Sequence, residues 1–442
     1  MTLGEIMNIG VIGLGFVGLS ISSVLASKNY NVVGIDIDKQ KCSDICDGVL
    51  PLFEPDLENT LRIGLKKKLT ISNNFSLIKN CDIIFVAVGT PQKSNGAIEL
   101  SMIKKATTTI GQIIRKSKKN SIIFIKSTVV PGTAQNVILP ILEKESGKKV
   151  NRDFGVISNP EFLQESNAIR DTKYPHAIVL GGEQSKYMKK AKMFFSKMHP
   201  NVPIVITNFQ TAEMIKYANN SFLATKISFI NQLSNICQNI PGTNIDDIAK
   251  IIGLDPRIGK LFLNAGPGYG GSCLPKDINA LINFAYKIGV KPMLLNAVEK
   301  TNHEQINNIV SLMKKILGNI TSKRITILGT AFKPNTDDVR GSKSIELIKK
   351  LLKNKAKITI HDPKAIESTK KIFGAKILYA KSIADALNKS QCGVIMTHWK
   401  QYDTLNNNSI KHMNKKIIVD CRRVLAKKKL DAEYYAIGIG KN

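Results

Sequence analysis

The sequence lacks any run of about 18 uncharged, mainly apolar residues, so it predicts no helix that spans a membrane. Cysteine is also scarce, because the 442 residues hold only seven, scattered along the chain and odd in number. Such cysteines do not make a disulfide framework, and they fit a reducing compartment. Cys42 and Cys46 have no second Cys or His pair at ligand spacing. We therefore expect no metal site.

Acidic residues are few, with 34 against 64 basic ones, and the net charge is +30. This balance permits binding to nucleic acid or to a membrane surface. The lysines, however, form many small groups and no dense block, which favours a generally solvated basic surface. We therefore predict neither a nucleic-acid nor a membrane partner. The apolar stretch 7–19 has four glycines and lacks the flanks of a signal peptide, so we expect a cytoplasmic protein.

The stretch after the first apolar segment matches a dinucleotide-binding fingerprint. Residues 8–12 predict a buried parallel strand, and a turn with the spacing G-x-G-x-x-G follows before a predicted helix. Asp36 ends the next predicted strand, where a carboxylate binds the ribose hydroxyls and repels a 2′-phosphate, so we predict NAD over NADP. Lys41 is either a contact to the adenosine side or an ordinary exposed lysine. The residues that we predict to bind NAD here are Gly13, Gly15, Phe16, Val17, Gly18, Asp36 and Lys41.

Two more apolar strands, predicted at 82–88 and 122–128, end close to residues with hydroxyl groups. In an open parallel sheet, ligands bind beyond the carboxyl ends of the strands. We therefore expect Thr90, Ser127 and Thr128 to lie where the cofactor meets the reacting carbon.

The segment 266–277 combines a flexible backbone with reactive side chains. Four of its first six residues are glycine, which lets the backbone press close to a ligand. Cys273 follows, and Asp277 comes four residues later beside Lys276, so a thiol, a candidate base and a positive charge share one segment. This is the composition of an activated nucleophile, because the thiolate is the reactive form. The alternative is a surface loop that ends in a buried, inert cysteine.

The segments 255–265 and 266–277 together resemble the active-site segment of the UDP-glucose/GDP-mannose dehydrogenase family. The resemblance includes the Asn-Pro-Glu-Phe-Leu run at 159–163 and the polar face of a long helix expected over 211–227. Its motifs occur in family order from about residue 7 to residue 442. The resemblance implies an NAD-dependent enzyme that oxidises the CH2OH of a nucleotide-sugar to a carboxylate in two hydride transfers.

The resemblance also implies roles for single residues. Cys273 would add to the sugar aldehyde, and Asp277 would take the hydroxyl proton through water held by Lys216. Glu161 and Thr128 would place water for hydrolysis of the thioester. Asn220 completes the implied catalytic set. Further implied NAD contacts are Thr90, Thr128, Glu165 and Arg340. Implied substrate contacts are Glu161, Phe162, Leu163, Lys216, Asn220, Arg257, Tyr269, Gly270, Phe332, Lys333 and Arg422.

We expect an α/β fold with two Rossmann-like parallel-sheet domains joined by a long-helix central region. The predicted domains are 1–207 for NAD binding, 208–316 for the cysteine loop and the dimer interface, and 317–442 for the UDP-sugar. The last domain has no second G-x-G-x-x-G, so it is not predicted to be a second NAD site. By resemblance, the protein is a homodimer in which Arg257 reaches the neighbouring subunit's sugar site.

Four positions depart from the family pattern. His176 lies in a Pro-His-Ala run that replaces Pro-Asp-Arg, so the role of that Asp-Arg pair must be filled differently. Gln232 replaces a usual glutamate, which we expect to remove one buried charge. His361 replaces a usual tyrosine, and Cys421 replaces a usual glycine.

The sugar is not decided by the sequence. The form of the cysteine loop resembles the branch that acts on UDP-glucose, whereas 88–96 and 146–149 resemble the GDP-mannose branch. We favour UDP-glucose, because the loop on the substrate side counts more in specificity. GDP-mannose and UDP-N-acetylhexosamine are the alternatives. From a different class, a non-catalytic NAD-binding protein or a basic polyanion binder remains open.

Overall fold

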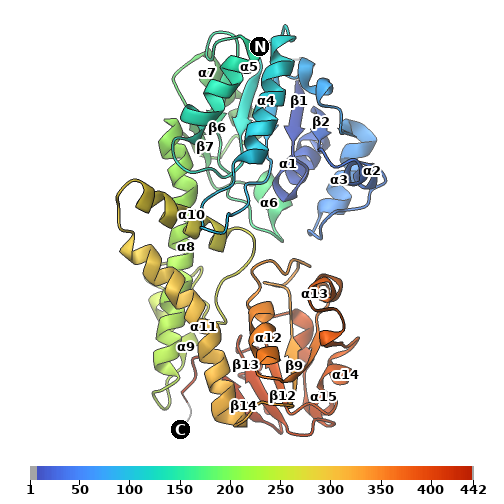
Figure 1. The fold of residues 1–442 in the computed structure, drawn as a ribbon, viewed down its shortest axis with the longest axis vertical. Coiled ribbons are helices and arrows are strands. Elements are labelled where there is room, and N and C mark those ends of the chain that lie inside the picture. Colours follow the sequence, from blue (N-terminus) through green and yellow to red (C-terminus); the bar gives the residue numbers. More distant parts are fainter. Residues whose placement is uncertain (1–6, 441–442) are drawn as a thin grey trace. The chain divides into compact units, whose positions relative to one another are not determined.

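The chain folds into two compact units, and the computed structural model describes residues 7–440. The first unit ends at Asn219 and the second begins at Asn220. Both residues belong to helix α8 (Phe209–Cys237), which is continuous across this boundary (Figure 1). Within residues 7–440, no helix has the length and apolar character that crossing a membrane requires.

The first unit contains an eight-stranded sheet with the order β3-β2-β1-β4-β5-β6-β7-β8. Its neighbouring strands are parallel, apart from β6 and β7, which meet at one antiparallel bridge. The strands are β1 (Asn8–Ile12), β2 (Asn31–Ile35), β3 (Leu69–Ser72), β4 (Ile83–Val86), β5 (Ile122–Ile125), β6 (Gly155–Ser158), β7 (Ile178–Gly181) and β8 (Ile204–Thr207).

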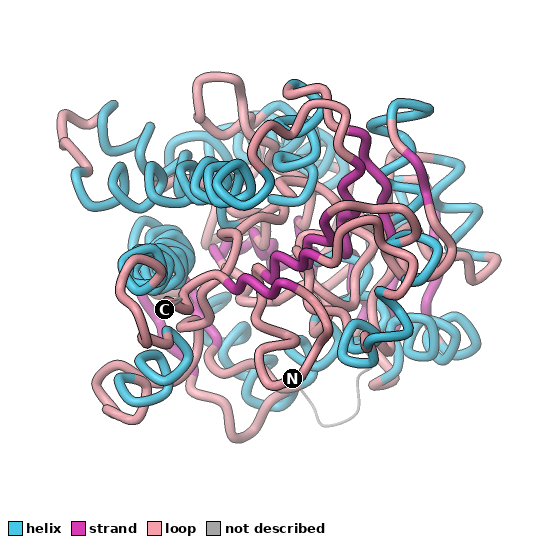
Figure 2. The backbone as a smooth tube through the Cα atoms, turned by 90° about the horizontal axis from the view of Figure 1, so that it is seen from below, coloured by secondary structure: helices cyan, strands magenta, loops and turns pink. Residues whose placement is uncertain are grey.

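Helices cover both faces of this sheet, which explains why its central strands are apolar at almost every position. Ile9 and Val11 of β1 pack in one core with α1, α3, α6 and α7, whereas Ile12 packs in a second core with α4 and α5. Figure 2 marks the helices and strands of the chain in a second view. The helices are α1 (Phe16–Ser27), α2 (Lys39–Cys46), α3 (Leu57–Lys67), α4 (Ser101–Arg115), α5 (Leu139–Ser146), α6 (Ala168–Lys173) and α7 (Lys186–Met198).

The second unit contains a six-stranded, fully parallel sheet with the order β11-β10-β9-β12-β13-β14. Its strands are β9 (Arg324–Leu328), β10 (Lys357–His361), β11 (Leu378–Tyr379), β12 (Cys392–Ile395), β13 (Ile417–Asp420) and β14 (Glu433–Ala436). Its helices after α8 are α9 (Ile245–Ile252), α10 (Leu274–Lys287), α11 (Met293–Leu317), α12 (Lys343–Lys353), α13 (Ile366–Phe373), α14 (Ile383–Leu387) and α15 (Asn407–Ile410).

The predicted fold class, with two Rossmann-like sheets and long helices, is confirmed. The predicted strand at 8–12 matches β1. The strands predicted at 82–88 and 122–128 are longer than β4 and β5, because residues beyond the last ladder bonds already belong to the loops at the strand ends. The bounds of the three predicted domains stay predictions.

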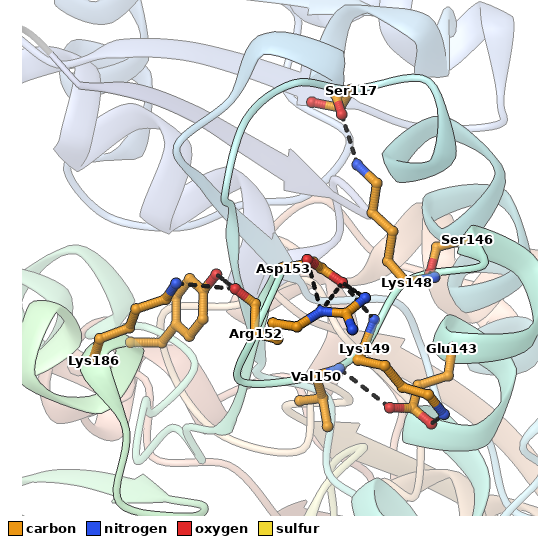
Figure 3. A network of polar contacts seen from close by, with 10 residues as sticks. Ser117, Glu143, Ser146, Lys148, Lys149, Val150, Arg152, Asp153 and Lys186 are labelled. Carbon is orange, nitrogen blue, oxygen red and sulfur yellow. Dashed lines mark hydrogen bonds and ion pairs between the residues drawn. The ribbon is translucent and has the colours of Figure 1, made fainter.

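A polar network holds the loop between α5 and β6 (Figure 3). Lys148 Nζ donates to the carbonyl oxygen of Ser117 at 2.6 Å. Lys149 Nζ lies 3.2 Å from Glu143 Oε2, and its backbone N–H donates to Asp153 at 2.8 Å. The segment 146–149 resembles the GDP-mannose branch, and its two lysines therefore have structural partners within the first unit.

Candidate active site

The turn between β1 and α1 fits a pyrophosphate group. Gly13 has a φ of 91°, and a Cβ there would lie 2.8 Å from the carbonyl oxygen of Ala87. A Cβ on Gly18 would lie 1.8 Å from the carbonyl oxygen of Gly13, so only glycine allows α1 to pack this closely. Gly15, the N-cap of α1, has open space around its Cβ position, and no described side chain caps the helix. The first N–H groups of α1 are thus available to an anion.

Asp36 lies at the end of β2, where the ribose of a dinucleotide is expected. It accepts the backbone N–H groups of Leu14 at 2.9 Å and Asp38 at 3.1 Å, and it pairs with Lys41 at 3.0 Å. Burial raises the pKa of Asp36, but these N–H groups and the Lys41 ammonium together hold it below its usual value. Asp36 is therefore a charged acceptor, and Lys41 is its partner. The residues present fit NAD.

The ends of β4 and β5 bring Thr90 and Thr128 together, as the sequence predicts. Thr90 Oγ1 donates to the carbonyl oxygen of Thr128 at 2.8 Å. Ser127 Oγ donates to the carbonyl oxygen of Val88 at 2.7 Å. A small hollow opens at these strand ends, and its lining includes Ser127, Thr128, Ser158, Pro160, Glu213 and Lys216.

Glu161 and Lys216 form a buried ion pair in the first unit. Glu161 Oε1 and Lys216 Nζ are 2.9 Å apart, and the two side chains are 8% and 5% exposed. The second carboxylate oxygen accepts the backbone N–H of Leu163 at 2.5 Å. Burial raises the pKa of Glu161, but Lys216 and this N–H hold it below its usual value. Burial also lowers the pKa of neighbouring Lys126 to about 8, and its ammonium donates to Asn159 at 3.0 Å.

Phe162 contacts His176, which stands where the family usually has an aspartate. Their ring centroids are 5.0 Å apart with an interplanar angle of 55°. Lys216 Nζ lies 5.9 Å from the centre of the Phe162 ring. An aromatic contact therefore supports the Phe162 loop at the position of the missing acid.

Two buried carboxylates hold loops of this region, although neither is among the predicted site residues. Glu54 accepts the backbone N–H groups of Ser166 and Ala168, each at 2.7 Å, and so fixes the loop that carries Glu165. Glu213 likewise accepts two backbone N–H groups, those of Gly132 and Ala134 in the loop after β5. The sequence signal for Glu213 is its place on the polar face of α8, three residues before Lys216. We find no comparable sequence signal for Glu54.

In the second unit, Cys273 is exposed and forms the N-cap of α10. Asp277 lies one turn further on, is 1% exposed, and donates its backbone N–H to the Cys273 carbonyl at 2.9 Å. Asn220 Nδ2 donates to Asp277 Oδ2 at 2.7 Å, and the Lys276 ammonium binds the other oxygen. The thiol and a fixed carboxylate thus share one helical turn. The alternative of a buried, inert cysteine is wrong for Cys273.

Side-chain amides hold the glycine turn before Cys273. Asn302 of α11 accepts the backbone N–H of Tyr269 at 2.9 Å and donates to its carbonyl at 3.2 Å. Gln305, one turn later, donates to the carbonyl of Gly266 at 2.9 Å, and Asn231 of α8 accepts the Gly266 N–H at 2.8 Å. A loop without secondary structure is therefore fixed at both backbone groups of two residues. No sequence motif identifies these three amide side chains as part of the site.

The glycine turn also packs against the loop after β9. A Cβ on Gly270 would lie 2.2 Å from a backbone oxygen of that loop, and one on Gly271 would lie 2.7 Å from the ring of Phe332. The Gly271 N–H donates to the Arg340 carbonyl at 3.1 Å. Lys333 Nζ lies 5.6 Å from the centre of the Phe332 ring. The structure thus brings together Gly270, Phe332 and Lys333, three of the predicted substrate contacts.

The remaining predicted arginines differ in their surroundings. Burial lowers the pKa of Arg422 to about 10, and its Nε donates to the Met396 carbonyl at 3.0 Å. Arg257 and Arg340 have exposed side chains, and each pairs with the aspartate two residues before it. Tyr269 is buried, and its hydroxyl donates to a glutamate of α11 at 3.0 Å. The ligand contacts of these residues stay predictions.

The other departures from the family pattern have structural explanations. Gln232 is exposed in the single chain, so it replaces no charge that would be buried within this chain. His361 is buried, and its Nδ1 lies 3.1 Å from the hydroxyl of Tyr402. Cys421 is fully buried in the core of the second sheet, and burial raises the pKa of its thiol. Among the described residues, no cluster of His, Cys, Asp and Glu has the arrangement of a metal site.

Three models of one family match the chain in order. They are the NAD binding domain of the UDP-glucose/GDP-mannose dehydrogenase family at residues 7–199, its central domain at 210–304 and its UDP binding domain at 326–427.

Curated and solved relatives cover almost the whole chain. A UDP-glucose 6-dehydrogenase of Rickettsia conorii is 39% identical over 98% of this chain and 99% of its own length. The UDP-glucose 6-dehydrogenase AglM of Haloferax volcanii is 38% identical over 97% and 99%. The solved UDP-glucose dehydrogenase of Pyrobaculum islandicum has a TM-score of 0.92 and 31% identity, and the match covers 99% of both chains. The chain therefore belongs to the UDP-glucose/GDP-mannose dehydrogenase family, with NAD as its cofactor and a nucleotide-sugar as its substrate.

Proposed function

We propose that this enzyme oxidises the C6 hydroxymethyl group of UDP-glucose to the carboxylate of UDP-glucuronate. The observation that carries this proposal is the exposed Cys273 one helical turn before Asp277, whose carboxylate is held by Asn220. The similarity to UDP-glucose 6-dehydrogenases over nearly the full chain supports the choice of sugar. NAD, when bound, accepts a hydride in each of two successive oxidations.

In the first oxidation, the sugar hydroxyl must lose its proton as C6 loses a hydride. We assign the proton to Asp277, through a water held by Lys216. An ammonium near a developing alkoxide stabilises it strongly in a site that excludes water. The pair between Lys216 and Glu161 keeps that ammonium in a fixed place. The product of this step is an aldehyde at C6.

An aldehyde does not lose hydride readily until a nucleophile has added to its carbon. We assign this addition to Cys273: its sulfur forms a bond to C6, and the carbonyl oxygen gains a proton. Loss of the second hydride, together with the hydroxyl proton, turns this thiohemiacetal into a thioester. The covalent bond also prevents the aldehyde from leaving.

Hydrolysis of the thioester completes the reaction. Water attacks C6, the C–S bond breaks, and the acid and the free Cys273 thiol are formed. We assign the placement of this water to Thr128 and Glu161, which both lie in the first unit. The lowered pKa of Glu161 keeps it ionised as an acceptor for the water's hydrogen.

The sugar is tested by following NADH release with UDP-glucose, GDP-mannose and the UDP-N-acetylhexosamines. We expect UDP-glucose to give the highest kcat/KM and two NADH for each sugar consumed. GDP-mannose and the UDP-N-acetylhexosamines are the alternative substrates, and a higher kcat/KM with either would overturn the choice of sugar.

The covalent step is tested by Cys273→Ser. We expect turnover to UDP-glucuronate to fall by at least a thousandfold, because a serine hydroxyl is a far weaker nucleophile than a thiolate. NAD binding should stay unchanged. Formation of the acid at the wild-type rate would show that the thiol is not needed.

We also propose that the enzyme is a homodimer. The second unit leaves large apolar side chains exposed on α8 at a spacing of seven residues, namely Phe222, Phe229 and Ile236. Exposed apolar stripes of this kind are typical of protein–protein interfaces.

A further inference from the structure

The carboxylate of Glu213 is buried against the loop that follows β5. Oε2 accepts the backbone N–H of Gly132 at 2.6 Å, and Oε1 accepts that of Ala134 at 2.8 Å. Ser158 of β6 adds a longer contact of 3.4 Å. The side chain is 4% exposed. Both carboxylate oxygens are therefore occupied by groups of the first unit.

Keeping a carboxylate here is costly for the fold. Burial raises the pKa of Glu213 to about 7, even though backbone N–H groups oppose this shift. A neutral polar or apolar side chain would avoid the penalty for burying a charge. A carboxylate has two acceptor oxygens and no donor when ionised, so it can accept both N–H groups of this loop.

The contacts of Glu213 connect two parts of the proposed chemistry. The loop that it holds begins with Thr128, whose carbonyl accepts the hydroxyl of Thr90. Lys216 follows Glu213 by one turn on α8, and it pairs with Glu161. Thr128, Glu213 and Lys216 line the same small hollow.

We propose that Glu213 is a positioning residue for the hydrolytic step: it fixes the loop that carries Thr128 against the face of α8 that carries Lys216. This inference rests on the proposed function, in which Thr128 and Glu161 place the water that cleaves the thioester. Glu213 itself touches neither substrate nor water in this proposal. It acts through the backbone of residues 128–134.

Glu213→Gln tests the inference, because the change keeps the size of the side chain and removes one acceptor. The amide nitrogen would face a backbone N–H, so either Gly132 or Ala134 loses its partner. A displacement of about 1 Å in a positioned group costs roughly a hundredfold in rate. We expect the steady-state kcat to fall by about tenfold to a hundredfold.

Rapid-quench kinetics with UDP-glucose at pH 8.5 separate hydrolysis from the earlier steps, since Glu213 is ionised there in the wild type. We expect the burst of two NADH per active site to keep its rate within about twofold in Glu213→Gln. The slow phase alone should decrease, and intact-mass spectrometry should show more enzyme with the sugar acyl group on Cys273. The KM for NAD should not change.

Gln210→Ala is the matched control. Gln210 lies on the same helix and bonds Gln135 of the same loop region, but this contact is exposed. We expect wild-type kinetics. If Glu213→Gln does not fold, Glu213→Asp replaces it: it keeps both acceptors but is one methylene shorter, and a smaller loss in the slow phase is expected.

Equal slowing of both phases, or an unchanged slow phase, would overturn the inference. These outcomes differ from a failure of the proposed function. In that case, the wild-type enzyme itself would release no NADH with UDP-glucose.

Discussion

Glu161 and Lys216 form a buried ion pair in the first unit, in which each charge is compensated by the other. Each is almost fully enclosed, and the two groups are 2.9 Å apart. Removing one partner of a buried pair leaves a charge without compensation, which is far more costly than replacing both. The pair therefore constrains substitutions even before catalysis is considered.

We predict that Lys216→Ala destabilises the first unit by about 3–5 kcal/mol at pH 8, as measured by urea unfolding. The double variant Lys216→Met with Glu161→Gln should recover most of this loss, because it leaves no unpaired charge. A single variant as stable as the wild type would contradict the role of the pair.

The pH dependence of the same variant has a definite sign. In the wild type, the pKa of Glu161 lies below its usual value. The contribution of Glu161 to the free energy of unfolding is therefore present at neutral pH, and it is lost as the pH falls through that lowered value. Without Lys216, burial would raise the pKa of Glu161. The stability deficit of Lys216→Ala relative to the wild type should therefore shrink as the pH is lowered from 8 toward 5.

At the scale of elements, the sequence predicts what each motif determines locally. The glycines of the β1–α1 turn and the apolar strands are readable because backbone conformation and burial act directly on those residues. The side chains that hydrogen-bond to a loop cannot be predicted from such local patterns. Asn302 and Gln305 lie more than 30 positions from the backbone groups that they bind, and an amide on a helix has no distinctive local pattern.

The edge strands show the same limit. β11 and β14 are short, and each pairs with one neighbour of the second sheet. The four residues of β14 include an exposed glutamate and two half-buried tyrosines, so no continuous apolar run marks them. Pairing with β13 decides their conformation. This long-range contribution is absent from local sequence patterns.

We predict that Asn302→Leu loosens the turn that carries Cys273. The leucine fills similar space, but it leaves the N–H and the carbonyl of Tyr269 buried without partners, at about 1–3 kcal/mol for each group. The thermal midpoint should fall, and kcat with UDP-glucose should fall by at least tenfold with little change in the KM for NAD. Asn307→Leu is the control on the same helix, because Asn307 is exposed and bonds only a neighbouring side chain. Equal activity of the two variants would contradict the role of Asn302.

At the scale of the whole molecule, the charge of +30 is spread over both units and draws anionic nucleotides toward the protein. This positive charge does not favour association between copies of the chain, because like charges repel. Association between copies must therefore use surfaces where apolar area exceeds charge.

The stripe formed by Phe222, Phe229 and Ile236 on α8 is such a surface, since these side chains are 66%, 51% and 51% exposed. Residues seven apart lie on one face of a helix, so the three can enter one interface. We predict that Phe229→Glu converts the proposed dimer to a monomer, as measured by light scattering after gel filtration, because it places a charge at the centre of the stripe. Leu378→Glu is the control: Leu378 is 68% exposed on edge strand β11, and the variant should remain a dimer. The monomer should also have a raised KM for UDP-glucose, because Arg257 is proposed to act across the interface. A Phe229→Glu variant with the wild-type mass in solution would place the interface elsewhere.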